Sequence, residues 1–163
     1  MDDLVQFLRA RLDEDEQAAW AAASKRGGGT WEAVLGDDFR SSVDGRYHEG
    51  ELGYPSRPVI IDPDDHETSV HIARHDPARV LAEVDAKRRL LADVLAEPHF
   101  RNEEDHWYTC AASTDQDGEP LCSDDGRAPG PCDCGRDQSV TRRVRLLALP
   151  YADHPDYRDD WRP

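Results

Sequence analysis

The sequence predicts an α+β fold that is mostly helical, with a small antiparallel sheet or hairpin and a cysteine-rich loop that a zinc ion can staple. Three observations lead to this expectation. Apolar residues recur with helical periodicity over residues 3–22 and 77–97, short candidate strands fall in a middle region that glycines interrupt, and all four cysteines lie within residues 101–138. A chain of 163 residues is long enough to bury one core, so we expect a single domain over residues 1–163.

Residues 3–22 are predicted to form an amphipathic helix. Apolar side chains recur along it at steps of three, four and seven residues, at Leu4, Val5, Leu8, Leu12 and Ala19. An aspartate at position 2 or 3 can cap this helix, because acidic groups suit the positive end of the helix dipole. The three glycines at 27–29 end it.

A small β region is predicted over residues 30–63, where glycines interrupt the chain repeatedly. Short stretches at Phe39–Val43 and Val59–Ile61 are the candidate strands, and Asp44-Gly45 is a turn signal. We expect a hairpin or a sheet of two to three strands here.

Helices are predicted over residues 64–97. The first covers 64–75 and is capped by an aspartate at its start, at position 64 or 65. His75-Asp76-Pro77 then marks a new start, because aspartate caps helices and proline suits their first turn. One apolar stripe follows along the second helix, formed by Val80, Leu81, Val84, Leu91, Val94 and Leu95. We expect this helix to pack against the N-terminal one.

The chain ends in a predicted short helix and tail over residues 139–163. Val140, Val144 and Leu147 lie on one side of the helix. The tail is acidic and aromatic, and it carries the residues that we predict to contact a partner: Tyr151, His154, Tyr157 and Trp161. The alternative is that this tail packs back onto the domain.

The cysteine loop, residues 101–138, has few apolar side chains that could order it. Four thiolates suffice for a tetrahedral zinc site. The predicted metal ligands are therefore Cys110, Cys122, Cys132 and Cys134, with His106 as a substitute ligand. Four protein ligands would close such a site, which favours a structural metal over a catalytic one.

The spacing of these cysteines leaves alternatives open. A zinc site is most recognisable as two Cys-x-x-Cys pairs, whereas this chain has one Cys-x-Cys unit and two separate cysteines. Four reduced cysteines without a metal, disulfides, and a redox or iron–sulfur role therefore remain as alternatives.

The histidines of the middle region suggest a different metal site. His66 and His71 are five residues apart, which does not match the zinc-protease motif, whereas His71 and His75 are four apart and could clasp a metal. No glutamate lies between these two to serve as a general base. A metal-dependent enzyme, built on these histidines or on an open cysteine site, is one alternative for the function.

The charge of the chain narrows the classes of partner. Its formal net charge of -15 disfavours direct binding to nucleic acid and to anionic membrane surfaces, and it allows a basic protein partner. No apolar run approaches the length of a membrane helix, and the acidic N-terminus lacks the features of a signal peptide. We therefore expect a cytoplasmic protein, in which thiols stay reduced.

Two stretches of the sequence resemble a known family. They are His71–Val84 with Lys87-Arg88-Arg89, and Leu146–Tyr157 with Trp161, and the opening helix Asp3–Glu14 agrees with them. Together they resemble a family of small uncharacterised proteins from actinobacteria and their phages. The resemblance implies an accessory protein of phage or mobile-element origin, and it carries no catalytic residues across.

The leading hypothesis is a non-catalytic interaction or regulatory protein with a structural metal site and a protein partner. It rests on the lack of a recognisable catalytic motif, the surplus of acidic residues and the cysteine loop. A second hypothesis is an acidic decoy that imitates the charge of DNA and occupies a nucleic-acid-binding protein. Ordinary solubility charge is the commoner cause of such a composition.

Overall fold

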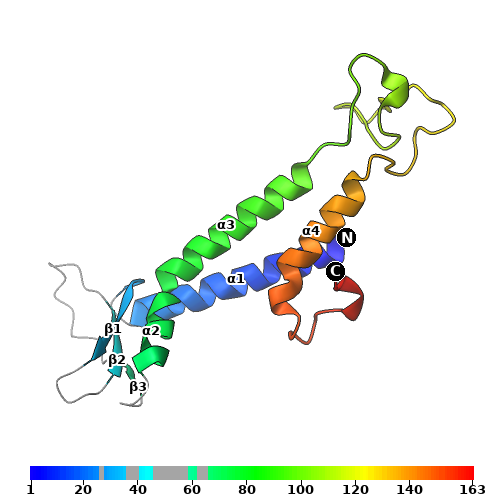
Figure 1. Ribbon diagram of the computed structural model, residues 1–163. Helices are drawn as coiled ribbons and strands as arrows, with labels where there is room; N and C mark the ends of the chain where they lie inside the picture. The colour runs from blue at the N-terminus through cyan, green and yellow to red at the C-terminus, as the bar shows by residue number, and fades with distance from the viewer. Residues whose placement is uncertain (26–27, 36–40, 46–58, 62–65) are drawn as a thin grey trace. The chain divides into compact units, whose positions relative to one another are not determined.

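The computed structural model describes residues 1–25, 28–35, 41–45, 59–61 and 66–163. It confirms the predicted fold class, because helices dominate and a small antiparallel sheet accompanies them (Figure 1). The elements are the helices α1 (Asp2–Lys25), α2 (His66–Arg74), α3 (Pro77–Ala96) and α4 (Arg136–Ala148), the strands β1 (Trp31–Leu35), β2 (Ser41–Gly45) and β3 (Val59–Ile61), and the short 3₁₀ helices η1 (His106–Tyr108), η2 (Leu149–Tyr151) and η3 (Asp159–Trp161).

The described residues form two compact units. Unit 1 comprises Met1–Leu8 and Arg89–Pro163, and unit 2 comprises Arg9–Arg88. The sheet lies in unit 2, and all four cysteines lie in unit 1.

The sheet of unit 2 has three antiparallel strands in the order β1-β2-β3. Ala33 of β1 lies opposite Val43 of β2, which in turn lies opposite Val59 of β3. Helix α2 packs against β1 and β2. Val43 and the small polar residues Ser41 and Ser69 are buried between these elements.

Two sequence predictions in this region need correction. Asp44-Gly45 is not a turn, because Asp44 pairs with Glu32 and Gly45 with Trp31, so that β2 continues through both residues. The strand Trp31–Leu35 was not among the predicted strands, because its apolar and polar residues alternate only weakly. The predicted start of a strand at Phe39 and the predicted caps at positions 64 and 65 lie outside the described residues.

The restart predicted at His75-Asp76-Pro77 is confirmed by two hydrogen bonds to one carboxylate. Asp76 Oδ1 accepts from the backbone N–H of Arg79 at 2.8 Å, as an N-cap does, and Asp76 Oδ2 accepts from the N–H of Trp31 at 3.2 Å. The same side chain therefore begins α3 and ties β1 to it.

Replacing Asp76 by alanine should lower the free energy of unfolding of unit 2 by about 1–2 kcal/mol, because a helix cap and a strand contact are lost together. Urea unfolding followed by circular dichroism measures this change. Gln17→Ala, at an exposed helical position in the same unit, is the matched control and should cause no loss. Equal unfolding midpoints for the two variants would contradict the capping role.

The two long helices pack together within unit 2, as predicted. Arg88 of α3 pairs with Asp13 of α1 at 2.6 Å and with Glu16 at 2.9 Å. Leu12 and Val84 are fully buried on the same two helices. Because the ion pairs are solvent-exposed and therefore weak, the buried apolar side chains supply most of the stability of this contact.

Unit 1 is built from the first turns of α1, the last turns of α3, and α4 with the segment that follows it. Its core is apolar and consists of Leu4, Phe7, Leu8, Leu91, Val94, Val140, Val144, Ala148 and Trp161. Helix α4 begins at Arg136, three residues earlier than predicted. Gly135 directly precedes it with a φ of 81°, a left-handed conformation that glycine adopts at little cost.

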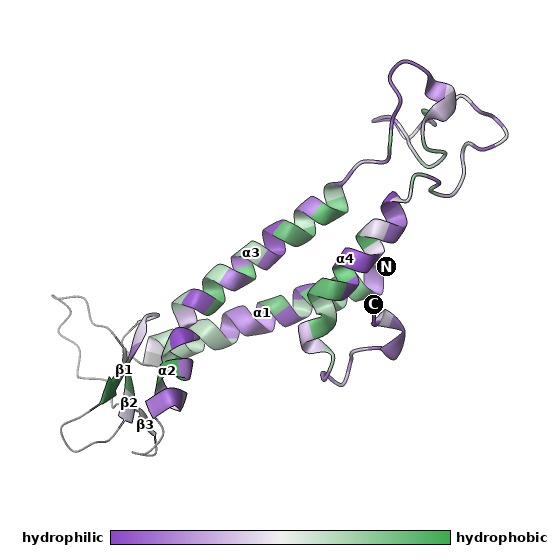
Figure 2. Cartoon of the chain, viewed as in Figure 1, coloured by the Kyte–Doolittle hydropathy of each residue, from purple (hydrophilic) through white to green (hydrophobic). Residues whose placement is uncertain are grey.

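The helices and the cysteine-containing segment differ in hydropathy, as the sequence predicts. Figure 2 shows apolar residues along the helices, whereas the long segment between α3 and α4 is mostly hydrophilic. None of the helices in the described ranges is both long and apolar enough to cross a membrane.

Candidate metal centre

The segment between α3 and α4 is irregular (Figure 1), yet backbone hydrogen bonds connect parts of it that are distant in sequence. Cys110 N–H donates to the carbonyl of Phe100 at 3.0 Å, and Leu121 N–H donates to that of Ser113 at 2.9 Å. The segment is therefore a folded module, although it contains only one turn of 3₁₀ helix. We call residues 99–134 the cysteine module.

Four potential metal ligands meet at the base of this module. The side chains of His99, Cys110, Cys132 and Cys134 each place one donor atom in a cluster in which all four atoms lie within 4.8 Å of one another. The Sγ atoms of Cys132 and Cys134 are 3.6 Å apart. His99 Nδ1 lies 3.6 Å from the Sγ of Cys110 and 3.8 Å from that of Cys134.

These distances fit a tetrahedral metal ion. A zinc ion with ordinary bond lengths holds two sulfur ligands about 3.8 Å apart, and a sulfur and a nitrogen ligand about 3.6 Å apart. All four cysteines are free thiols, and the 3.6 Å between Cys132 and Cys134 is too long for a disulfide bond. Three thiols and one imidazole are a donor set that zinc prefers.

The environment of the cluster prepares one thiol for metal binding. Burial alone would raise the pKa of Cys134, but hydrogen bonds from the backbone N–H groups of Phe100 and Arg136 and from His99 and Cys110 outweigh it and lower the pKa to about 6. Cys134 is therefore a thiolate near neutral pH, and the thiolate is the form that binds metals. Burial raises the pKa of Cys110 in the same cluster.

A carboxylate lies near the outer ring nitrogen of His99. Asp137 Oδ1 lies 3.7 Å from Nε2 of His99, on the side of the ring opposite the nitrogen that faces the thiols. This distance is longer than a hydrogen bond, but a carboxylate beside the outer nitrogen of a metal-binding imidazole helps to hold the ring in position. Arg136, the neighbour of Asp137, donates to the carbonyls of Leu95 and Glu97 and so joins the start of α4 to the end of α3.

The whole chain, residues 1–163, matches the Family of unknown function (DUF6221). The chain belongs to this family. The resemblance found in the sequence to a family of uncharacterised proteins is therefore confirmed at that level, while the actinobacterial and phage setting stays a prediction. No curated protein and no solved structure matches the chain.

In this DUF6221 protein, the cluster of candidate ligands differs at one position from the set that the sequence predicts. Cys110, Cys132 and Cys134 meet as expected, but His99 takes the place assigned to Cys122. His106, the predicted substitute, begins η1 and is exposed. His99 was missed because the predicted loop began at residue 101. Its position directly after the proline that ends α3 was the available signal.

Cys122 has a separate role in the cysteine module. It is buried, and its thiol donates to the carbonyl of Trp107 at 3.8 Å. Arg127 donates to the same carbonyl and to the Sγ of Cys122, and it also pairs with Asp133, which lies between Cys132 and Cys134. This network connects the cluster of His99 and three cysteines to η1.

The tail packs into the core of unit 1. Trp161 is only 9% exposed, and its ring lies 5.2 Å from that of Phe7 and 5.8 Å from that of Tyr157. His154 also lies against Phe7, at 5.7 Å, whereas Tyr151 is half-buried at the end of η2. Partner binding by these four residues stays a prediction, but their aromatic rings already contribute to the fold.

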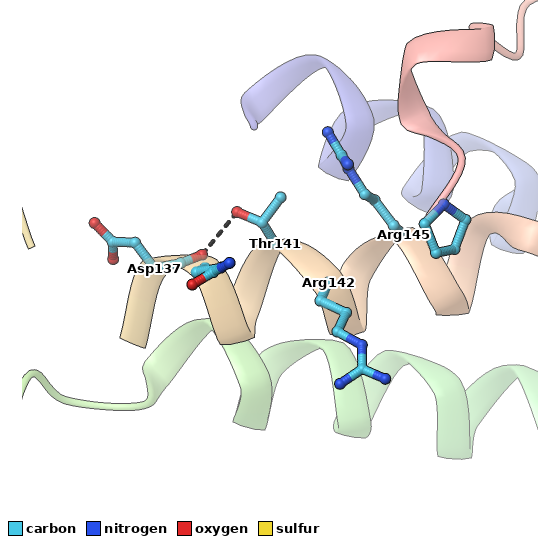
Figure 3. Close-up of a pocket in the computed structure, with 6 residues that line it drawn as sticks. Asp137, Thr141, Arg142 and Arg145 are labelled. Atoms are coloured by element: carbon cyan, nitrogen blue, oxygen red, sulfur yellow. Dashed lines mark hydrogen bonds between the residues drawn. The ribbon is translucent and has the colours of Figure 1, made fainter. Parts of the chain in front are cut away.

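Two surface grooves lack converging ligands. One, of about 420 Å³, lies along α4, and Figure 3 shows that the side chains of its Arg142 and Arg145 point away from one another. The other is lined by His71 and His75, whose rings are 4.4 Å apart, with Nδ1 of His75 donating to the carbonyl of His71. Within the described part of the chain, no third metal-binding side chain joins this pair closely enough to form a cluster.

Replacing Asp137 by asparagine should weaken zinc binding about tenfold or more, because the imidazole of His99 loses its orienting carboxylate. Competition with a zinc-chelating dye measures the affinity. Asp125→Asn removes the same charge at an exposed position of the cysteine module and should leave the affinity unchanged. If both variants bind zinc as the unmodified protein does, Asp137 does not support the site.

Proposed function

We propose that the cysteine module binds one zinc ion through His99, Cys110, Cys132 and Cys134, and that the protein is a non-catalytic interaction protein. The observation that carries the metal assignment is the convergence of four suitable donor atoms from three separate stretches of the chain. Such convergence fits a tetrahedral site, and thiolate and imidazole ligands favour zinc over magnesium or calcium.

The role of the zinc in this proposal is structural. Four protein ligands fill a tetrahedral coordination sphere, so no position is left for water or a substrate. The cysteine module also needs such a staple, because its buried side chains are few and small, among them Thr109, Cys110 and Ala111. Binding a metal offsets the entropy that ordering a polar segment of this length costs.

The proposed role in binding a protein partner rests on the loop whose conformation the zinc would fix. A closed metal site supplies no catalyst, yet it fixes the conformation of a loop that exposes polar and aromatic side chains. Rigid loops of this kind are efficient binding surfaces, because little conformational entropy is lost on association.

Metal analysis tests the proposal directly. Protein purified without chelator or affinity-tag metal should carry about one zinc per chain by elemental mass spectrometry. The double variant Cys132→Ser and Cys134→Ser should lose it, whereas Cys122→Ser should retain it, because Cys122 lies outside the cluster. A zinc-free protein with four titratable thiols would refute the metal site.

A further inference from the structure

The short helix η1 of the cysteine module exposes two large aromatic side chains. Trp107 is 51% exposed and Tyr108 is 66% exposed, both on η1. Tryptophan and tyrosine are the residue types that most often supply binding energy at protein interfaces. Three acidic residues, Glu103, Glu104 and Asp105, directly precede η1 and are exposed as well. We call residues 103–108 the acidic-aromatic edge.

The backbone of this edge is held in place from its N-terminal side. Asn102 Oδ1 accepts from the N–H groups of Glu104 and Asp105 at 3.0 and 3.1 Å. Asp105 Oδ1 in turn accepts from Trp107 N–H at 3.0 Å and caps η1. The edge therefore has a defined conformation before any partner arrives, which lowers the entropic cost of binding.

Hydrogen bonds from other parts of the cysteine module hold the backbone that carries the aromatic rings. The carbonyl of His106 accepts from Ser123 N–H at 3.2 Å. The carbonyl of Trp107 accepts from the guanidinium of Arg127 and from the thiol of Cys122. These hydrogen bonds hold the backbone of η1, and the rings of Trp107 and Tyr108 that it carries are exposed to solvent.

The charge around the edge selects the kind of partner. Residues 99–134 contain nine acidic side chains and two arginines, a formal net charge of -7. Arg101 pairs with Glu103, and Arg127 pairs with Asp124 and Asp133, so both cations are already engaged within the module. A negative surface of this kind attracts cationic partners and repels nucleic acid and anionic lipid.

We infer that the acidic-aromatic edge docks an arginine-bearing basic peptide segment of a protein partner. An arginine guanidinium stacks on the face of tryptophan or tyrosine and is attracted to their π-electrons, and the carboxylates beside the rings complete its neutralisation. This inference deepens the proposed interaction role and rests on it, and it adds the surface and the chemical class of the partner.

The test uses the zinc-loaded full chain and a fluorescent peptide of alternating arginine and glycine. Fluorescence anisotropy should show binding that weakens with added salt, and a glutamate-glycine peptide should not bind. The double variant Trp107→Ala and Tyr108→Ala should bind the arginine peptide about tenfold more weakly. Trp20→Ala, which removes a tryptophan that is 60% exposed on α1, should bind it normally.

A second pair of variants separates the edge from the overall charge. Glu103→Gln with Glu104→Gln should weaken binding severalfold, whereas Glu67→Gln with Asp93→Asn, which removes the same charge elsewhere, should change it little. The inference would be overturned if the aromatic double variant bound the peptide as tightly as Trp20→Ala, and the Glu103/Glu104 variant as tightly as the Glu67/Asp93 variant. Self-association of the protein through Trp107 in sedimentation experiments would also overturn it, because the occupant would then be a second copy.

Measuring the zinc content of every variant separates the docking inference from the proposed metal site. Protein that carries zinc but ignores the arginine peptide overturns the docking inference alone. Protein that carries no zinc overturns the proposed metal site, whichever peptide it binds. Because Trp107 and Tyr108 are not metal ligands, their variants should retain zinc and fold normally.

Discussion

Removing zinc should unfold the cysteine module and leave unit 2 folded. Backbone amides of residues 99–134 should lose about a hundredfold or more of their protection from hydrogen exchange when a chelator is added, because zinc binding and folding of such a segment are one equilibrium. The N–H groups of Cys110 and Leu121, which are hydrogen-bonded within the module, are the best reporters. Mass spectrometry of peptide fragments measures the exchange.

Unit 2 supplies the internal reference for this experiment. Amides in residues 9–25 of α1 belong to unit 2, whereas the cluster lies in unit 1, so their exchange should not change with chelator. Adding zinc back should restore protection in the module. If protection in the module survives complete loss of zinc, the backbone hydrogen bonds suffice to hold it and the staple is unnecessary.

Replacing Trp161 by alanine should lower the free energy of unfolding of unit 1 by about 3 kcal/mol. The indole is almost fully buried and packs on Phe7 and Tyr157, and truncating a buried tryptophan removes its apolar contacts and leaves a cavity. Arg158 also lies over the indole, at 5.2 Å from the ring, and loses this contact. Urea unfolding of the full chain, followed in the near-ultraviolet circular dichroism spectrum, measures the change.

Trp107→Ala is the matched control for this variant. Its indole lies in the same unit but is half exposed, so its loss should cost less than about 1 kcal/mol. If Trp161→Ala is as stable as Trp107→Ala, the tail does not contribute to the core. The tail would then be free for the partner contact that the sequence predicts.

The helices show how far local sequence signals reach. The apolar stripe and the Asp76-Pro77 start predict a helix from Pro77 to Glu97, and α3 runs from Pro77 to Ala96. These signals are contained in neighbouring residues, because helical hydrogen bonds and caps join positions three or four apart. The strand β1 and the continuation of β2 through Gly45 depend instead on pairing between segments, and the turn signal at Asp44-Gly45 was overridden by it.

The sequence by itself determined that the chain is acidic, mostly helical and endowed with enough cysteine for a metal site. Only the tertiary structure decided which residues gather into a candidate metal site. Cys122 instead donates a hydrogen bond to the carbonyl of Trp107. His99, just after the end of α3, lies beside the three other cysteines. The donor atoms of a metal site must lie close together in space. The hydrogen bond from Arg136 to the carbonyl of Glu97 joins the chain just after Cys134 to the chain just before His99, and spacing along the sequence does not encode such a contact.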